Sequence, residues 1–289
     1  MSFLKNTAFG IRCHRIENQE LVMHSQLCNF FKVPPSNIFF VLDDTKIKQP
    51  SNNTQEIQII SINDYINSKN IKTYPQNIGW LCGDLFYYAL AQKQQFDFYW
   101  LIEPDVSFGD GTYNFFNTLE ANHDDFIAPR FGEISSTSYW YHTGKDISDR
   151  IYSCSFPLTR MSFNAIRLCE KYRIEMFDMD ASKKIPNDEV FISTTLKKHG
   201  FSTSDLCNIT KLNFSNFSTT IPLLSIDNKK ADHIYHPALI WDEFISKYTS
   251  RFISALSNGN HVNFVQKSIQ GLNSSQLKEV AWLIYGNIK

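Results

Sequence analysis

The chain has 289 residues, of which 43% are hydrophobic and 20% are charged, values typical of a globular protein with a substantial core. Its formal net charge of −1 provides no broad positive field, which argues against nucleic acid as the main partner. The six cysteines lack paired spacing, and we see neither a secretory signal nor an apolar run near the roughly 18 residues that cross a bilayer, so we expect a cytoplasmic protein with reduced thiols.

Strand-like and helix-like segments alternate along the first two thirds of the chain. Strands are predicted at residues 7–12, 37–42, 96–102 and 124–129. Helices are predicted at 19–31, from 61 onward, and at 83–93, 162–172 and 187–199, while the polar stretch 46–55 is typical of an exposed loop. This alternation predicts an α/β fold with a mostly parallel central sheet flanked by helices.

The pattern changes after Trp241, where three further helices are predicted at residues 242–256, 262–269 and 274–288. We therefore expect a catalytic domain at 1–240 and a helical C-terminal appendage at 241–289. An amphipathic face of the appendage could lie on a membrane, with Trp282 and Tyr285 near the interface. Packing against the α/β domain or a second subunit explains the same helices, and the sequence leaves these alternatives open.

Acids follow the apolar strand predicted at residues 96–102, in the segment Glu103-Pro104-Asp105. Carboxylates at the end of a rigid strand can bind a hard divalent cation that bridges a diphosphate. The alternative is that these acids only mark a turn from strand to loop.

The segment from Gly79 to Asp110 resembles the centre of GT-A glycosyltransferases, in which a helix precedes an apolar strand ending in a DxD motif. Glu103-Pro104-Asp105 is similar to an ExD version of that motif. The resemblance implies a Rossmann-like GT-A fold, with Asp105 as a direct ligand of Mn²⁺ or Mg²⁺ and Glu103 near the ribose or metal-bound water. It also implies that Asp84 lies near the nucleotide, although an acid favoured by a helix N-terminus explains Asp84 equally well.

A second resemblance lies in Asn187-Asp188-Glu189, which is similar to the xED element of GT-A enzymes. In inverting members, the second acid of that element is the general base for the acceptor hydroxyl. The resemblance assigns this role to Glu189, with Asp188 as the alternative. A helix cap followed by acids that the helix dipole favours is the competing interpretation.

Further site residues are implied by the same resemblance. His236 resembles the late histidine that completes the metal site in many GT-A enzymes, and His233 is a poorer candidate. Arg12 ends the first predicted strand and Asp43 directly follows the second, where Arg12 could neutralise phosphate and Asp43 could bind ribose or base. Both are also compatible with ordinary charges at loop edges.

Aromatic residues between the two acidic segments are the candidates for binding the acceptor. Aromatic faces beside polar groups suit the CH surfaces of sugars, and core packing is the alternative. The candidates are Trp140, Tyr141, His142 and Arg160.

These features together predict a metal-dependent, inverting glycosyltransferase that moves a sugar from a nucleotide-sugar donor to a glycan or lipid-linked glycan acceptor. The composition, rich in Asn and Lys, is associated with bacterial surface polysaccharide or lipooligosaccharide synthesis. The sequence lacks GxSxG, HExxH and GxxxxGK[ST], so serine hydrolase, zincin and P-loop functions have no motif in support. A sugar nucleotidyltransferase and a non-catalytic carbohydrate-binding protein with the same fold remain the alternatives.

Overall fold

The computed structural model describes residues 6–46, 57–178, 184–218, 220–223, 230–259, 262–269 and 272–288. The chain folds into two compact units. The first comprises Met1–Pro104 and Tyr113–Lys211, and the second comprises Asp105–Thr112 and Leu212–Lys289. Apart from Lys46, the loop predicted at 46–55 lies outside the described residues.

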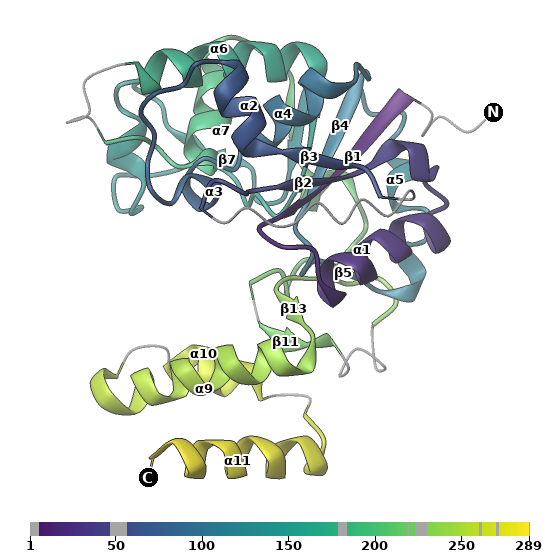
Figure 1. Cartoon of the computed structure of the whole chain (residues 1–289), viewed down its shortest axis with the longest axis vertical. Helices are drawn as coiled ribbons and strands as arrows, with labels where there is room; N and C mark the ends of the chain where they lie inside the picture. The colour runs from purple at the N-terminus through teal and green to yellow at the C-terminus, as the bar shows by residue number, and fades with distance from the viewer. Residues whose placement is uncertain are drawn as a thin grey trace. The chain divides into compact units, whose positions relative to one another are not determined.

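The first unit is built on a seven-stranded sheet (Figure 1). In spatial order its strands are β10 (Thr203–Asp205), β6 (Phe126–Ala128), β9 (Leu158–Ser162), β4 (Phe98–Ile102), β1 (Thr7–Cys13), β2 (Ile38–Leu42) and β3 (Ile59–Ser61). Strand β9 is antiparallel to both of its neighbours, and the other pairings are parallel. The mostly parallel α/β sheet expected from the sequence is confirmed.

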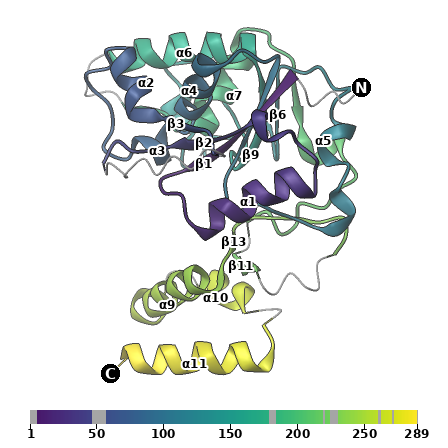
Figure 2. The ribbon, with the colours of Figure 1, turned by 45° about the vertical axis from the view of Figure 1, so that its right-hand side comes forward.

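Helices cover both faces of this sheet (Figures 1 and 2). Helices α2, α4, α6 and α7 lie on one side, and α1 and α5 lie on the other. The helices are α1 (Asn18–Asn29), α2 (Ile62–Ser68), α3 (Ile78–Leu81), α4 (Leu85–Lys93), α5 (Phe115–Thr118), α6 (Phe163–Phe177), α7 (Asp188–Lys198) and α8 (Leu206–Ile209). Short 3₁₀ helices η2 (Pro35–Asn37) and η4 (Tyr141–Gly144) and a hairpin of β7 (Gly132–Glu133) with β8 (Tyr152–Ser153) complete the unit.

Burial on both faces explains why the strands are continuously apolar rather than alternating. On the α4 side, a Cβ added to Gly10 of β1 would lie 2.9 Å from Leu90 Cδ2, so the glycine lets the helix approach the sheet closely. On the opposite side, the ring of Phe9 meets that of Phe116 edge to face at 5.0 Å. The rigid core formed in this way fixes the ends of β1, β2 and β4.

The second unit combines short strands with three helices. Strand β5 (Ser107–Phe108) pairs antiparallel with β12 (Ile234–Tyr235), and β11 (Ile221–Pro222) pairs parallel with β13 (Ala238–Leu239). A 3₁₀ helix, η3 (Asp110–Thr112), follows β5, and the C-terminal helices are α9 (Trp241–Asn258), α10 (Val262–Ser268) and α11 (Ser274–Ile288). The three helices expected after Trp241 are confirmed, whereas the domain boundary at residue 240 stays a prediction.

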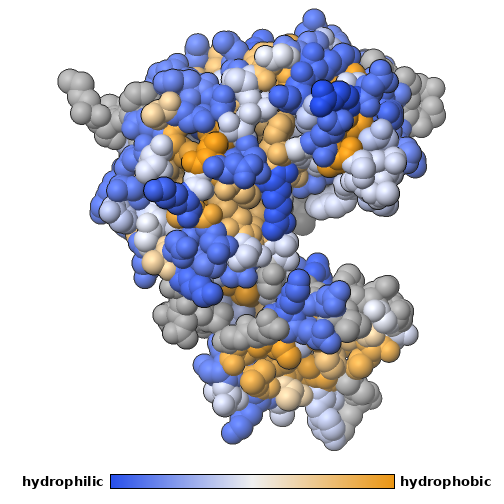
Figure 3. Space-filling model, turned by 180° about the vertical axis from the view of Figure 1, so that it is seen from behind, coloured by the Kyte–Doolittle hydropathy of each residue, from blue (hydrophilic) through white to orange (hydrophobic). Residues whose placement is uncertain are grey.

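The helices of the second unit pack around Leu239, Phe244, Tyr248, Leu272 and Val280. Apolar side chains also remain on their outer surface, where Figure 3 shows an extended apolar region over the helical part. The exposed side chains are Ile253, Leu256, Leu277, Trp282 and Tyr285. Within the described ranges, no helix is both long enough and apolar enough to cross a bilayer. Peripheral membrane contact stays a prediction.

Candidate functional site

The carboxyl ends of β1, β2 and β4 lie at one edge of the first unit's sheet because these neighbouring strands are parallel. Each end supplies a charged residue predicted from the sequence. Arg12 is the residue before the last in β1, Asp43 follows β2, and Glu103 follows β4. Ligand sites of open α/β sheets form at this edge.

Arg12 bridges two acids that are far apart in the sequence. Its Nη1 lies 3.0 Å from Glu103 Oε1 and 3.3 Å from Asp188 Oδ2, while Nη2 donates to the Gly79 carbonyl oxygen at 2.6 Å. Burial lowers the pKa of Arg12, but the neighbouring carboxylates raise it by more, so the guanidinium stays charged. Arg12 therefore connects the acid after β4 to the acid at the start of α7, and its predicted contact with phosphate stays a prediction.

Asp188 is buried and held by three donors. Besides Arg12, its carboxylate accepts hydrogen bonds from the amides of Gly83, at 3.1 Å, and Glu189, at 2.8 Å. Burial raises the pKa of Asp188 to about 8, against the opposing effect of Arg12. Asn187 accepts a hydrogen bond from the Val190 amide at 3.2 Å and caps α7, as the helix-cap interpretation requires. These contacts fix Asp188 in one position.

Glu189 is only half-buried and is held more loosely. Its Oε2 accepts a hydrogen bond from Asn187 Nδ2 at 3.2 Å. Burial raises the pKa of Glu189, while the hydrogen bonds from Asn187 and the Phe156 backbone lower it. A partly exposed carboxylate with a raised pKa is suited to accept a proton near neutral pH. Of the two acids in this segment, Glu189 is the better candidate for a base.

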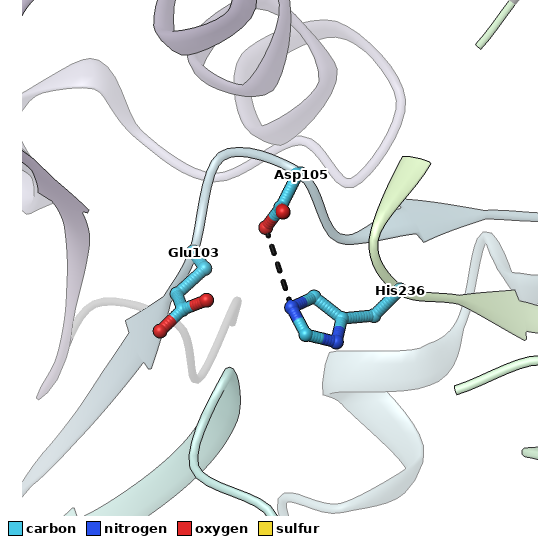
Figure 4. Close-up of side chains that lie close together, drawn as sticks. All are labelled: Glu103, Asp105 and His236. Atoms are coloured by element: carbon cyan, nitrogen blue, oxygen red, sulfur yellow. Dashed lines mark ion pairs between the residues drawn. The ribbon is translucent and has the colours of Figure 1, made fainter. Parts of the chain in front are cut away.

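Asp105 and His236 meet in the second unit because of the β5–β12 pairing. Asp105 precedes β5 by two residues and His236 directly follows β12, so the antiparallel register brings both to the same end of the pair. His236 Nε2 lies 3.4 Å from Asp105 Oδ1 (Figure 4). The ring of Phe217 lies beside His236, with centroids 5.2 Å apart.

These two residues and Glu103 form a group with the chemistry of a cation site. One ligand atom from each of the three lies within 4.8 Å of the others. Among the described residues, the buried Asp105 Oδ1 accepts no hydrogen bond, and His236 Nε2 lies 3.4 Å from it; a cation beside such an oxygen would lower the cost of its burial. Two carboxylates and an imidazole suit a manganese-like ion, so the residues present fit the metal expected from the sequence. His233, the poorer candidate, is buried and pairs with Asp232 through Nδ1 at 2.9 Å.

Asp84 occupies a different environment from the one that the resemblance implies. It is fully buried, and Arg173 donates to both of its carboxylate oxygens, through Nε at 2.7 Å and Nη2 at 2.9 Å. The Tyr88 hydroxyl donates to Asp84 Oδ2 at 2.7 Å. With its oxygens occupied and no surface exposed, Asp84 is an internal partner of Arg173 and is not accessible to a ligand.

Asp43 lies at the strand edge and is half-buried. Its Oδ1 accepts hydrogen bonds from the backbone and the hydroxyl of Thr45, the latter at 2.6 Å. A Cβ on Gly79 would overlap the Asp43 carboxylate, so this acid lies directly against the backbone of α3. Its predicted contact with ribose or base stays a prediction.

The four acceptor candidates fall into two groups. Trp140 and Tyr141 are half-buried and His142 is exposed, all at or next to η4. Arg160 is instead a buried residue of the antiparallel strand β9, and its guanidinium donates to the carbonyl oxygens of residues 119, 122 and 124. Because these bonds hold Arg160 inside the fold, its guanidinium is not accessible to an acceptor.

One aromatic residue was missed by the sequence analysis. Trp80 in α3 is 64% exposed, and its ring centroid lies 6.0 Å from that of Trp140. The sequence feature that could have indicated Trp80 is its position between Gly79 and Gly83, since glycines often lie where the backbone closely approaches other groups.

The chain is similar to solved structures of known proteins at low sequence identity. No protein-family model and no curated protein match the chain. Among solved structures, mouse xyloside xylosyltransferase 1 in its apo form is 8% identical, with 80% of this chain and 97% of that chain covered and a TM-score of 0.43. Galactosyltransferase LgtC in complex with donor and acceptor sugar analogs is 10% identical, with 78% and 79% covered and a TM-score of 0.38. With TM-scores below 0.5, these likenesses carry no weight for function.

Proposed function

We propose that this protein is a metal-dependent glycosyltransferase that moves a sugar from a nucleotide-sugar donor to a glycan acceptor. The observation that carries the proposal is the group of Asp105, His236 and Glu103, in which the buried Asp105 Oδ1 accepts no hydrogen bond from the described residues. His236 Nε2 lies 3.4 Å from this oxygen, and a divalent cation is the further partner that the three side chains suit. When bound, Mn²⁺ or Mg²⁺ would supply positive charge to the departing diphosphate.

Glu189 is the proposed base on the acceptor side. As the acceptor hydroxyl attacks the anomeric carbon, its proton moves to the Glu189 carboxylate, the new glycosidic bond forms, and the bond to the diphosphate oxygen breaks. Asp188 is held by Arg12 and by two backbone amides, so its proposed role is to position the start of α7. A single displacement of this kind inverts the anomeric configuration.

The cation site can be tested by thermal shift, since a ligand that binds only the folded chain raises the melting temperature. We expect Mn²⁺ with a nucleoside diphosphate to stabilise the native protein, and Asp105→Ala and His236→Ala to remove that shift. Asp110→Ala is the matched control, because Asp110 is an exposed acid of the same segment. Equal stabilisation of Asp105→Ala and the native protein would refute the metal site.

The products of the reaction decide between the proposed function and its alternatives. Incubation with nucleotide sugars, Mn²⁺ and a glycan panel should release nucleoside diphosphate and form a glycoside of inverted configuration. Pyrophosphate release from a nucleoside triphosphate would instead indicate a nucleotidyltransferase. A product that keeps the donor configuration would remove the base role from Glu189. Synthesis of a bacterial surface polysaccharide or lipooligosaccharide stays a prediction about the acceptor.

A further inference from the structure

Three aromatic side chains from two distant segments form an exposed group on the first unit. Trp80 is 64% exposed and Tyr139 is 84% exposed, and both lie against the half-buried Trp140. The Trp80 and Trp140 centroids are 6.0 Å apart with their planes tilted by 54°, and Tyr139 meets Trp140 edge to face at 4.8 Å. We call Trp80, Tyr139 and Trp140 the aromatic platform.

The segment that carries Trp80 is bonded to the candidate site on both sides. In the first turn of α3, the Gly79 carbonyl oxygen accepts from Arg12 Nη2 at 2.6 Å, and after α3 the Gly83 amide donates to Asp188 Oδ2 at 3.1 Å. A Cβ on Gly83 would overlap both the Asp188 carboxylate and the Arg12 guanidinium. The backbone that holds Trp80 is therefore part of the wall around these charged groups.

The segment that carries Trp140 packs on the helix that begins with the two acids. A Cβ on Gly144, at the end of η4, would lie 2.9 Å from Val190 Cγ1, so η4 contacts α7 one residue beyond Glu189. The Thr143 hydroxyl donates to the Trp140 carbonyl oxygen at 2.7 Å and closes the turn below the ring. Both halves of the aromatic platform are thus continuous with the proposed acceptor side of the site.

The composition of the surface indicates which ligand it suits. In residues 77–82 and 138–145, the large apolar side chains that are exposed are aromatic, while Ile78 is buried and Leu81 packs against the core. The exposed polar side chains His142 and Lys145 lie in the second segment. Flat aromatic faces bordered by hydrogen-bonding groups match the CH faces and hydroxyls of sugars.

We propose that the aromatic platform binds the sugar rings of the glycan acceptor. This inference rests on the proposed function and adds to it a substrate class, an oligosaccharide held by stacking, and a new residue, Trp80. Because the platform takes no part in donor chemistry, loss of its rings should weaken acceptor binding and leave donor cleavage unchanged. Tyr141 is not part of the platform, since Lys145 Nζ lies 4.8 Å from its ring centroid.

The test compares Trp80→Ala and Trp140→Ala with Tyr113→Ala, which removes another exposed aromatic side chain of the same unit. Lactose, cellotetraose, chitotetraose and maltotetraose serve as acceptors, and hydrolysis of the nucleotide sugar by water is measured in parallel. For the acceptor that the native protein uses best, we expect KM to rise about tenfold or more in both tryptophan variants. We expect kcat and donor hydrolysis to stay near the native values, and Tyr113→Ala to behave like the native protein.

Two outcomes would overturn the inference, and they differ from a failure of the proposed function. If the tryptophan variants keep the native KM for the acceptor while donor hydrolysis continues, the platform does not bind the acceptor. If the native protein shows neither transfer nor hydrolysis, the proposed function fails. Calorimetric titration with the same four oligosaccharides then tests separately whether the aromatic platform binds sugars. Equal binding by the native protein and Trp80→Ala, or no binding by the native protein, would refute sugar binding by the platform.

Discussion

Arg12 and Glu103 are joined by an ion pair of 3.0 Å at the carboxyl edge of the central sheet. The same guanidinium lies 3.3 Å from Asp188, so one cation holds together an acid of the proposed metal site and an acid of α7. Removing Arg12 would leave two carboxylates facing each other in a mostly buried position.

We expect Arg12→Gln to destabilise the protein by about 1–3 kcal/mol, the cost of leaving buried hydrogen-bonding groups without their partner. Chemical denaturation at neutral pH measures this loss. Arg12→Lys keeps the charge but cannot reach Gly79 and both acids at once, so it should lie between the native protein and Arg12→Gln. A stability of Arg12→Gln within about 1 kcal/mol of the native value would show that the bridge contributes little.

Glu189 should control the acid side of the pH–rate profile. Burial raises the pKa of this carboxyl above its ordinary value of 4.5, and the base must be deprotonated, so kcat/KM should rise with pH through a pKa above 4.5. Glu189→Gln should lower kcat by about 10²–10⁴-fold and remove this limb. Asp188→Asn is the comparison, because a positioning residue should leave the limb in place; an unchanged profile in Glu189→Gln would transfer the base role elsewhere.

Asp188 should make stability depend on pH in the opposite sense from an ordinary surface carboxyl. Its pKa of about 8 in the folded chain exceeds the ordinary 3.8, so folding favours the protonated form. That contribution is complete below about pH 4 and is lost as pH rises through about 8. Between pH 5 and 9, the melting temperature of the native protein should therefore fall relative to that of Asp188→Asn. Parallel curves for the two proteins would contradict the shift.

Arg173 should be needed for the start of α7 as well as for stability. Besides pairing with Asp84, it donates to the Pro186 carbonyl oxygen at 3.0 Å, directly before the helix cap. Arg173→Met should cost about 3–5 kcal/mol, because the fully buried Asp84 loses its partner. Arg167→Ala on the same helix is the control and should cost less than about 1 kcal/mol, since Arg167 is largely exposed.

A double variant separates charge from position in this pair. Arg173→Met with Asp84→Leu should recover much of the lost stability, because no unpaired charge remains. It should still show reduced activity, since the bond to Pro186 is missing. Full activity in the double variant would limit Arg173 to a role in stability.

Gly83 should tolerate no side chain. A Cβ there would overlap the Asp188 carboxylate and the Arg12 guanidinium, so Gly83→Ala should lower activity strongly by displacing both. Gly132→Ala is the control, because among the described residues none beyond its two chain neighbours has an atom within 4 Å of its added Cβ. Activity of Gly83→Ala equal to that of Gly132→Ala would show that the cluster adjusts without loss.

Hydrophobic periodicity predicted much of the fold. The strands β1, β2 and β4 and the helices α1, α4, α6 and α7 lie within a few residues of the predicted segments, because each carries a clear apolar pattern. Strand β9 was missed because residues 158–162 mix apolar and polar side chains and contain Arg160. The sequence alone does not show that Arg160 is buried, because its hydrogen-bond partners are backbone carbonyl oxygens, which no residue type marks. They belong to residues 119, 122 and 124.

The candidate site was predictable where its residues follow the ends of strands. Glu103 and Asp105 were visible in this way, and His236 came from the resemblance alone. The pairing of Asp84 with Arg173 was not predictable, because 89 residues separate them and only the packing of α4 against α6 brings them together. Trp80 was hidden for a related reason, since a tryptophan in a short apolar segment is typical of a core residue.

The second unit takes one short piece, Asp105–Thr112, from the middle of the chain and the rest from its C-terminal part. Strand β5 lies in that piece, and its partner β12 lies more than a hundred residues later. Truncation after Lys211 would therefore leave β5 behind with an unpaired edge, together with Asp105 but without His236. To express the first unit alone, residues 105–112 should be replaced by a short linker. To fold as it does in the intact chain, the C-terminal part needs strand β5 to be supplied with it.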